Sequence, residues 1–500
     1  MPGLLRYVDE RVSRLARAAY GDSRCAGLRL GTNPPSFSSN NSATFSLDAQ
    51  HPACARQATG EVMQMSQTTP VVTMRSYGFL GFLTVLNVLN FVDRQLLASF
   101  SNYIVPDLGL TNTQFGLLTG LIFLTFYSVA GLFMGTLADR VNRTRFIALG
   151  VGLWSLLTAA SGMAKGFLSL AAPRMLIGVG ESILTPTAMS LLADRFPTQR
   201  LGFASGFYYM GVPIGVGVSL LIVGYVGPVI GWRNCFYLLG GIGLVLALVM
   251  FFLKDPKRSV ASVNVSSDGV QPGFFDLLKI LFAALKASPA LTMTIGGGVA
   301  FHFILGASTF DQLWYVQERG FDKAEIAQIT GWIGITAGIA GNLFGGLGGD
   351  YFLKKTGVGR PMFLFLVMLV LAPVNIAYRL VEPDYWVFWL GVGAGFFQLG
   401  CFYGPTFSTV QELVPEEIRA TVVAFYILLL NMAGVAIGVS LAGVYIDYLV
   451  AIGNPQPYTQ ALLWFTVISL AAIPLFYFAG RYYETDKARL NALVQAGLKG

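Results

Sequence analysis

The sequence predicts an all-α integral membrane protein built from twelve transmembrane helices in two pseudo-symmetric six-helix halves. Hydrophobic residues make up 54% of the 500-residue chain and charged residues only 12%, whereas soluble domains carry roughly 25% charged residues. Apolar stretches of membrane-spanning length follow one another along the chain, and a motif of the first half recurs in the second. Lipid is therefore the expected solvent for most of this chain.

Each expected span is long enough to cross a bilayer. An apolar helix needs about 20 residues to cross a hydrocarbon core about 30 Å thick. The stretches that meet this length are residues 77–104, 114–137, 146–164, 167–192, 201–227, 234–253, 290–316, 326–349, 361–380, 385–411, 420–448 and 460–480. An even number of spans places both termini on the same side of the membrane.

Lysine and arginine gather in the loops that follow even-numbered spans. These loops carry Arg140, Arg143, Arg145, Arg195, Arg200, Lys254, Lys257, Arg258, Lys354, Lys355, Arg360 and Arg419, whereas the odd-numbered loops carry Lys165, Arg233, Arg319, Lys323 and Arg379. Because cytoplasmic loops hold the excess of basic residues, the even-numbered loops and both termini are predicted to be cytoplasmic. The net charge of +7 serves this topology, and we expect no nucleic-acid partner.

Two polar regions separate or flank the expected spans. Residues 1–75 predict a disordered tail or a start assigned too early, rather than a transit peptide, because acidic residues occur among the basic ones. Residues 254–289 predict a cytoplasmic linker with an amphipathic helix on the membrane surface. This linker separates an amino-terminal half, residues 76–253, from a carboxy-terminal half, residues 290–482, and residues 483–500 predict a cytoplasmic tail.

The two halves repeat each other at a nearly constant spacing. Gly135-Thr-Leu-Ala-Asp139-Arg140 is matched 211 positions later by Gly346-Leu-Gly-Gly-Asp350, and both segments end an apolar stretch before basic residues. Phe91-Val-Asp93 is matched 218 positions later by Thr309-Phe-Asp311. A nearly constant offset is uncommon by chance, so the sequence indicates a duplicated bundle whose halves move against each other.

Three segments of the first half form recognisable motifs: Phe91-Val-Asp93-Arg94-Gln-Leu-Leu, the stretch from Asp107 to Gly120, and Arg174-Met-Leu-Ile-Gly-Val-Gly-Glu181 with Thr185-Pro186-Thr. With the twelve spans in two halves, they resemble the Spinster-type members of the major facilitator superfamily, particularly bacterial ones. The loop motif departs from the superfamily pattern at Asn142, where glycine is usual, and at Thr144, where a basic residue is usual. The resemblance, over residues 77–482, implies a major facilitator fold in a bacterial inner membrane. It also implies proton-linked secondary transport of an organic or amphipathic, lipid-like solute by a monomer.

Charged side chains inside the first expected span predict a functional site. Asp93 and Arg94 lie about seventeen residues into that span, and Asn87, Asn90 and Arg94 form a polar stripe at helical spacing. A charge near the bilayer centre costs at least about 2.5 kcal/mol, so it usually faces a cavity or a partner. The alternative is a partly solvated pair at the helix end.

The fourth span predicts a proton-coupling residue. Arg174, Gly178 and Glu181 fall on one helix face. An apolar setting disfavours the ionised form of a carboxylate and a nearby arginine favours it, so a balanced group changes protonation with conformation. Glu181 is the first candidate for proton coupling and Asp93 the second; a static Arg174–Glu181 brace is the alternative.

The second half offers weaker candidates for a solute cavity. His302 and Asp311 lie in the seventh span, and Asp311 is the repeat partner of Asp93. A lone histidine in an apolar helix is more often a hydrogen-bonded core residue. The remaining cavity candidates are Asn342, Gln398, Tyr403 and Asn431, with Tyr208 from the first half; each also suits a contact between helices. Since Arg94 aligns with Gln312 and Glu181 with Ala394, the chemistry is predicted to lie in the first half.

Charged residues at the cytoplasmic helix ends predict a gate. Its candidates are Gly135, Asp139, Arg140, Arg143, Asp194, Arg195, Arg200, Asp350, Glu412, Glu416 and Arg419. Asp139 is expected to contact the Glu412 to Arg419 region of the other half, and Asp350 to lie opposite Asp194, Arg195 and Arg200. Such a latch would break as the halves rock.

The sequence disfavours enzymes, metal sites and bound cofactors. It contains no nucleotide loop, HExxH or GxSxG, and its four cysteines lack ligand spacing. Protons are the expected coupling ion, and a small or lipid-like solute and membrane lipids are the expected partners. Two alternatives stay open: an organic-anion or sugar-acid proton symporter with Arg94 or Arg174 as counter-ion, and a membrane receptor without transport.

Overall fold

The computed structural model describes residues 73–138, 140–255, 282, 284–414 and 416–497. The predictions for residues 1–72, for most of the linker and its amphipathic helix, and for Asp139 lie outside the described residues. The side chain of Glu416 lies outside them too.

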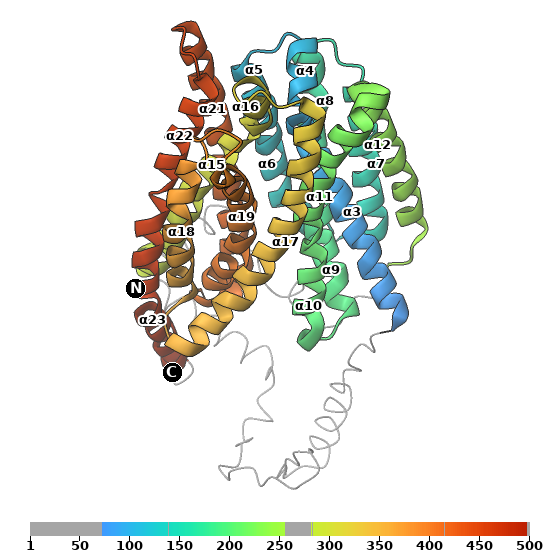
Figure 1. Cartoon of the computed structure of the whole chain (residues 1–500). Coiled ribbons are helices and arrows are strands. Elements are labelled where there is room, and N and C mark those ends of the chain that lie inside the picture. Colours follow the sequence, from blue (N-terminus) through green and yellow to red (C-terminus); the bar gives the residue numbers. More distant parts are fainter. Residues whose placement is uncertain (1–72, 139, 256–281, 283, 415, 498–500) are drawn as a thin grey trace, which may run out of the picture. The chain divides into compact units, whose positions relative to one another are not determined.

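The first six spans are built from ten α-helices and one π-helical segment (Figure 1). In chain order they are α3 (Met74–Ser99), α4 (Ser101–Asp107), α5 (Asn112–Thr119), α6 (Leu121–Ala138), α7 (Arg143–Ser161), α8 (Phe167–Glu181), α9 (Leu184–Arg195), α10 (Thr198–Tyr209), α11 (Gly211–Leu221), the π-helical segment Ile222–Val226 and α12 (Gly227–Phe252). Consecutive short helices continue one another within a span, as α5 and α6 do around Gly120.

The second six spans follow the same scheme. They comprise α15 (Pro289–Ala307), the 3-10 turn Ser308–Phe310, α16 (Asp311–Gln317), α17 (Lys323–Thr356), α18 (Arg360–Ala377), α19 (Trp386–Glu412), α20 (Glu416–Leu429), the π-helical segment Leu430–Ala436, α21 (Ile437–Ala451), α22 (Pro457–Ser469) and α23 (Ala472–Gly497). π-Helical segments therefore interrupt both the fifth and the eleventh span, which the repeat pairs with each other.

Length and hydropathy alone pick out ten membrane-crossing stretches in the described part of the chain. One of them, Arg200–Phe252, holds two of the expected spans. Gly231 divides it, with φ of 79°, a backbone conformation that favours glycine. The other difference is α17, a glycine-rich helix of 34 residues. With these two accounted for, the twelve predicted spans and the all-α fold are confirmed.

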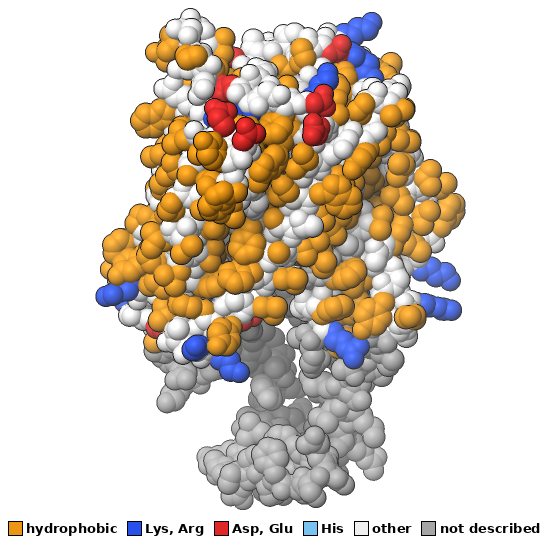
Figure 2. Space-filling view, in the orientation of Figure 1, with side chains coloured by type: hydrophobic (Ala, Val, Ile, Leu, Met, Phe, Trp, Pro, Cys, Tyr) orange, Lys and Arg blue, Asp and Glu red, His pale blue; other side chains and the backbone are white. Residues whose placement is uncertain are grey.

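A belt of hydrophobic side chains covers the middle of the bundle, and charged side chains lie toward its two ends (Figure 2). Leu149, Phe133 and Val370 are among the large apolar residues whose side chains are more than 60% exposed. Such an apolar surface suits lipid rather than water.

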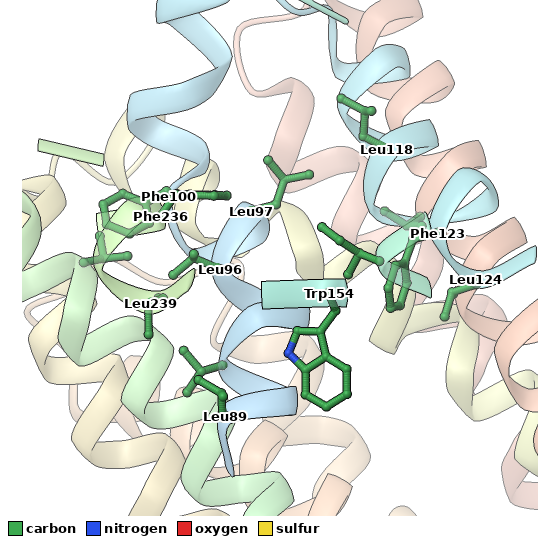
Figure 3. Close-up of a cluster of buried hydrophobic side chains, with 14 of the residues drawn as sticks. Leu89, Leu96, Leu97, Phe100, Leu118, Phe123, Leu124, Trp154, Phe236 and Leu239 are labelled. Carbon is green, nitrogen blue, oxygen red and sulfur yellow. The ribbon is translucent and has the colours of Figure 1, made fainter. Parts of the chain in front are cut away.

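The interior is packed with aliphatic and aromatic side chains from helices far apart in sequence. Figure 3 shows Leu96 of α3, and Phe100 between α3 and α4, near Phe236 of α12, and Trp154 of α7 in the same cluster. Phe100, Trp154 and Leu96 are fully buried. This core fixes α3, which carries the first pair of intramembrane charges.

The two halves contact each other closely where α5 meets α21 and α11 meets α17. A Cβ atom at Gly116 of α5 would lie 2.7 Å from the backbone oxygen of Val439 on α21. Only a residue without a side chain allows this approach. The glycines of these helices thus bring the halves together.

Polar contacts between the halves lie at one end of the bundle, here called the Asn112 end and defined by Asn102, Asn112, Thr113 and Asp447. Asp447 of α21 accepts hydrogen bonds from the backbone and side chain of Asn112 (3.1 and 2.9 Å) and of Thr113 (2.8 and 2.6 Å). Asn102 donates to the backbone oxygen of Gln312 at 2.7 Å.

At the opposite end, here called the Arg143 end and defined by Arg143, Asp194, Asp350 and Arg360, ion pairs link residues of the same half. Arg143 pairs with Asp194 at 2.6 Å and with Asp255 at 2.9 Å. Arg360 pairs with Asp350 at 2.8 Å.

Candidate functional site

A cavity of about 300 Å³ lies between the halves and is lined by residues of both. Side chains from α3, α6 and α11 line it on one side, and side chains from α15 to α19, α21's preceding π-helical segment and α22 on the other. Its polar lining includes Arg94, Gln95, Asp311, Gln312, Asn375, Arg379, Gln398 and Asn431. Apolar and aromatic side chains supply most of the rest.

Arg94 of α3 connects this cavity to a buried carboxylate. Its Nε lies 3.3 Å from Oε2 of Glu181, and the two side chains are 17% and 0% exposed. The Arg94 guanidinium also lies over the Tyr127 ring, 4.3 Å from its centroid. Arg94 therefore stands between the cavity and Glu181, which does not itself belong to the lining that the described residues form.

Arg174 of α8 donates hydrogen bonds to the backbone of α3. Its Nη2 donates to the backbone oxygen of Arg94 at 2.7 Å, and its Nη1 to that of Asp93 at 3.4 Å. Its guanidinium lies over the Phe123 ring at 4.4 Å. The sequence offered a static Arg174–Glu181 brace as the alternative to proton coupling; in the structure the hydrogen-bonded ion pair of Glu181 is with Arg94.

Asp93 is buried next to this pair, with 3% of its surface exposed. Neither of its carboxyl oxygens has a well-formed hydrogen bond to a described residue, although the Trp154 indole interacts with it. An isolated ionised carboxylate is costly in such surroundings. Asp93, Arg94, Arg174 and Glu181 thus form one buried charge cluster on α3 and α8.

The second half contributes an ion pair of its own. Arg379 follows α18 and pairs with Asp311 of α16, Nη1 to Oδ1, at 3.1 Å. Both residues line the cavity, and Arg379 is 2% exposed. Arg379, counted as a loop residue in the sequence, is therefore a buried cavity residue. The second half thus adds an ion pair to the cavity, beside the first half in which the chemistry was predicted to be concentrated.

The structure divides the other cavity candidates into two groups. Gln398, Tyr403 and Asn431 line the cavity, and Gln398 accepts a hydrogen bond from Asn375 at 2.5 Å. The described lining does not include Asn87, Asn90, Arg174, Tyr208, His302 or Asn342.

The residues outside the lining make structural contacts. His302 Nδ1 lies 2.8 Å from the backbone oxygen of Gly298, and its ring packs on Phe402. Asn87 donates to the backbone oxygen of Tyr208 at 2.9 Å. These contacts hold helices together, as the sequence allowed.

Several cytoplasmic gate candidates have described partners within their own half. Asp350 pairs with Arg360, which also pairs with Glu412 at 2.6 Å. Arg195 lies over the Phe79 ring at 3.7 Å, and Arg200 donates to Tyr77 at 3.0 Å. Asp350 thus has a partner in its own half rather than Asp194, Arg195 or Arg200.

Two further gate candidates lie around the end of α6. A Cβ atom added at Gly135 would lie 3.9 Å from Cβ of Pro186, and Arg140 is exposed just after the helix. Arg419 of α20 donates to the backbone oxygen of Gln411 at 2.9 Å. Asp139, the residue on which the latch depends, lies outside the described residues.

Comparison with known proteins decides the family. The model of the Major Facilitator Superfamily matches residues 83–439. The chain belongs to the major facilitator superfamily. This superfamily member is 26% identical to an MFS-type efflux pump of Mycolicibacterium smegmatis over 417 residues, which cover 82% of the chain and 94% of that protein. It is 28% identical to the hexuronate transporter of Bacillus subtilis over 384 residues, covering 73% and 87%.

The Spinster-type resemblance of this superfamily member is confirmed. It is 25% identical to a probable sphingolipid transporter, spinster homolog 2, of Arabidopsis thaliana over 418 residues, covering 78% of the chain and 84% of that protein. Its fold matches the crystal structure of a bacterial homologue of the human lysosomal transporter Spinster, in an inward-facing and unoccupied conformation. That match has a TM-score of 0.69 and 23% identity, and covers 83% of this chain and 99% of the other. The relatives of this superfamily member are transporters, not enzymes.

Arg379 and Asn375 are among the cavity residues of the superfamily member that sequence reasoning missed. Arg379 ends an apolar stretch, where a solvated loop arginine would also stand, so no local pattern marks it as buried. Asn375 lies one helical turn earlier on α18 and also lines the cavity. The spacing of Asn375 and Arg379, two polar residues four positions apart near the end of an otherwise apolar span, was the one sequence pattern that indicated a shared polar face.

Proposed function

We propose that the protein is a proton-linked secondary active transporter of a compact organic anion, working by alternating access. The observation that carries this proposal is that one arginine from each half, Arg94 and Arg379, lines the same cavity, and each is paired with a carboxylate, Glu181 and Asp311. A buried arginine matches the geometry of a carboxylate or phosphate group.

The proposed direction of access rests on charge and on contacts between the halves. The Arg143 end carries the Lys and Arg excess that marks cytoplasmic loops. The Asn112 end is bridged by hydrogen bonds between the halves. We therefore assign the structure to an inward-facing conformation, in agreement with the conformation of the matched Spinster homologue.

Glu181 is the proposed proton-coupling residue, with Asp93 beside it. When the anion of a solute pairs with Arg94, it competes with Glu181 for the same guanidinium. A carboxylate that loses its cationic partner in an apolar setting favours its protonated form. Binding of an anion and binding of a proton are then linked, which is what symport requires.

The proposed solute is compact. A volume of about 300 Å³ is at the low end of the ~300–1,000 Å³ typical of ligand sites. A sugar acid suits this size and the two arginines, and the similarity to the hexuronate transporter supports the same class.

A single-chain lysolipid or sphingolipid is the second candidate. Aromatic residues such as Phe123, Phe301 and Phe396 line the cavity beside the charged groups, and this combination suits an amphipathic ligand. The similarity to the probable sphingolipid transporter supports it.

The test is transport in proteoliposomes under an imposed pH gradient, with labelled glucuronate in one arm and a labelled lysolipid in the other. We expect glucuronate uptake that rises with the gradient. In Glu181→Gln the gradient-driven uptake should fall at least tenfold, while exchange of glucuronate without a gradient persists. Asp107→Asn is the matched control, because Asp107 forms an exposed ion pair with Arg233 away from the cavity.

Unchanged proton dependence in Glu181→Gln contradicts the coupling role. Uptake of the lysolipid without uptake of glucuronate contradicts the choice of solute class and supports the second candidate.

A further inference from the structure

The Arg379–Asp311 pair lies at a part of the cavity that the coupling scheme does not use. Arg379 follows α18, Asp311 begins α16, and Gln312 lies next to Asp311 in the same lining. These residues belong to the second half, whereas Arg94 and Glu181 belong to the first.

Two polar atoms of this group lack a partner among the described residues. They are Nε of Arg379 and Oε1 of Gln312, both buried. Arg379 and Gln312 are 2% and 8% exposed. Buried polar groups are nearly always hydrogen-bonded, so an unsatisfied donor and acceptor in a cavity wall indicate a place for a ligand.

The Arg379 side chain is also held in place from outside the cavity. Its guanidinium lies over the rings of Tyr378 and Trp314, at 4.7 and 5.2 Å. Its backbone oxygen accepts a hydrogen bond from Arg319, at 2.5 Å. A positioned guanidinium loses less freedom on binding an anion, which favours affinity.

We propose that Arg379 forms a second anion subsite, which takes the second carboxylate of a dicarboxylic organic acid whose first carboxylate is held by Arg94. This inference rests on the proposed function and names its substrate class. In the absence of solute, Asp311 is the ion-pair partner of Arg379. When the solute binds, its second carboxylate replaces Asp311 as the partner of Arg379. A solute bound at both arginines connects the two halves across the cavity.

The experiment compares two six-carbon sugar acids that differ in their number of carboxylates. Binding of glucuronate, with one carboxylate, and of glucarate, with two, is measured by calorimetry on the full chain in nanodiscs. In the unmodified protein we expect glucarate to bind at least tenfold more tightly. The double variant Arg379→Gln/Asp311→Asn should lose this preference and bind the two acids with equal affinity.

The double variant avoids leaving Asp311 buried without a partner, which by itself threatens folding. Arg233→Gln/Asp107→Asn is the matched control. It also removes an arginine–aspartate pair, but an exposed one that the described cavity lining does not include. This variant should keep the preference for glucarate.

Equal affinity for the two acids in the unmodified protein overturns the second subsite and leaves the proposed function standing. A preference for glucarate that persists in the double variant overturns it as well. Absence of glucuronate binding, or glucuronate binding that Arg94→Gln does not weaken, contradicts the proposed function instead, and with it the inference.

Discussion

At the scale of single residues, three of the buried charged residues of the first half, Arg94, Arg174 and Glu181, make different contacts. Arg94 reaches the cavity, Glu181 pairs with it, and Arg174 binds backbone oxygens instead of a carboxylate. Sequence spacing placed Arg174 and Glu181 on one face of a helix. It could not show that α3 would bring another arginine, Arg94, to Glu181.

The position of Arg174 predicts a structural effect of its loss. Arg174→Gln should lower the stability of the protein, because the Arg174 guanidinium donates to two backbone oxygens of α3 and a hydrogen bond of a charged group contributes about 1.5–3 kcal/mol. Thermal unfolding in nanodiscs, followed by tryptophan fluorescence, measures it as a lower Tm, and exposed Lys165→Gln is the control. An unchanged Tm combined with lost transport would instead place Arg174 on the solute path.

At the scale of elements, α21 caps α5 across the boundary between the halves. The Asp447 carboxylate accepts four hydrogen bonds from Asn112 and Thr113 at the start of α5. Nothing in the sequence near Asp447 announces this contact, since its partners lie more than 330 positions away. An acceptor at a helix amino terminus is also favoured by the helix dipole.

Asp447→Asn is predicted to favour opening of the Asn112 end. The amide presents one acceptor oxygen where the carboxylate presents two, and its NH₂ group faces backbone donors. Distances between spin labels on α5 and α21 should shift toward a longer population relative to the unmodified protein. Asp107→Asn, within one half, should leave the distribution unchanged; if both variants behave alike, Asp447 is not a contact that controls opening.

The amino terminus of α17 gives a prediction on pH. Backbone N–H groups of Glu325 and Ala324 donate to Asp322 and hold the pKa of this exposed carboxyl below its ordinary value. A depressed folded-state pKa stabilises the fold above the unfolded pKa of about 3.9, and this contribution is lost as pH falls through the folded pKa.

Asp322→Ala should therefore lower Tm at neutral pH, and the difference from the unmodified protein should narrow as the pH falls below about 4. Asp322→Asn keeps a capping oxygen but not the charge, so it should lower Tm less than Asp322→Ala at neutral pH, and its difference from the unmodified protein should disappear at low pH. A gap between Asp322→Ala and the unmodified protein that is constant with pH would rule out the charge as the source.

At the scale of the whole molecule, the described contacts between halves lie toward the Asn112 end, and the described ion pairs of the Arg143 end stay within each half. Rocking of two halves about a cavity needs contacts that break at one end while each half stays intact. The ion pairs of Arg360 with Asp350 and Glu412 help to keep the second half intact during this motion.

Closing the Asn112 end covalently should stop transport. Thr113 and Asp447 face each other, Oγ1 to Oδ2, at 2.6 Å, so Thr113→Cys with Asp447→Cys should form a disulfide on oxidation. We expect at least a tenfold loss of glucuronate transport with binding retained, and recovery on reduction. Ser288→Cys with Asp486→Cys, within the second half at 2.9 Å, is the control; full transport by the oxidised Thr113/Asp447 pair contradicts alternating access.

The sequence by itself determined the membrane class, the twelve spans, the duplication and the transporter family. These follow from hydrophobic length, a repeated spacing and local motifs, all of which are properties of neighbouring residues. It also indicated Asp93, Arg94 and Glu181, because charges inside an apolar stretch are visible without a fold.

The tertiary structure decided which charges meet. It paired Arg94 with Glu181 and buried Arg379 against Asp311, 68 positions away. It also paired Asp350 with Arg360 of the same half and brought the Asp447 carboxylate of α21 to the start of α5. Whether an arginine at a helix end is solvated or buried depends on the helices packed around it. The physical reason is that ion pairing and burial are set by distance in space, which spacing along one helix does not report.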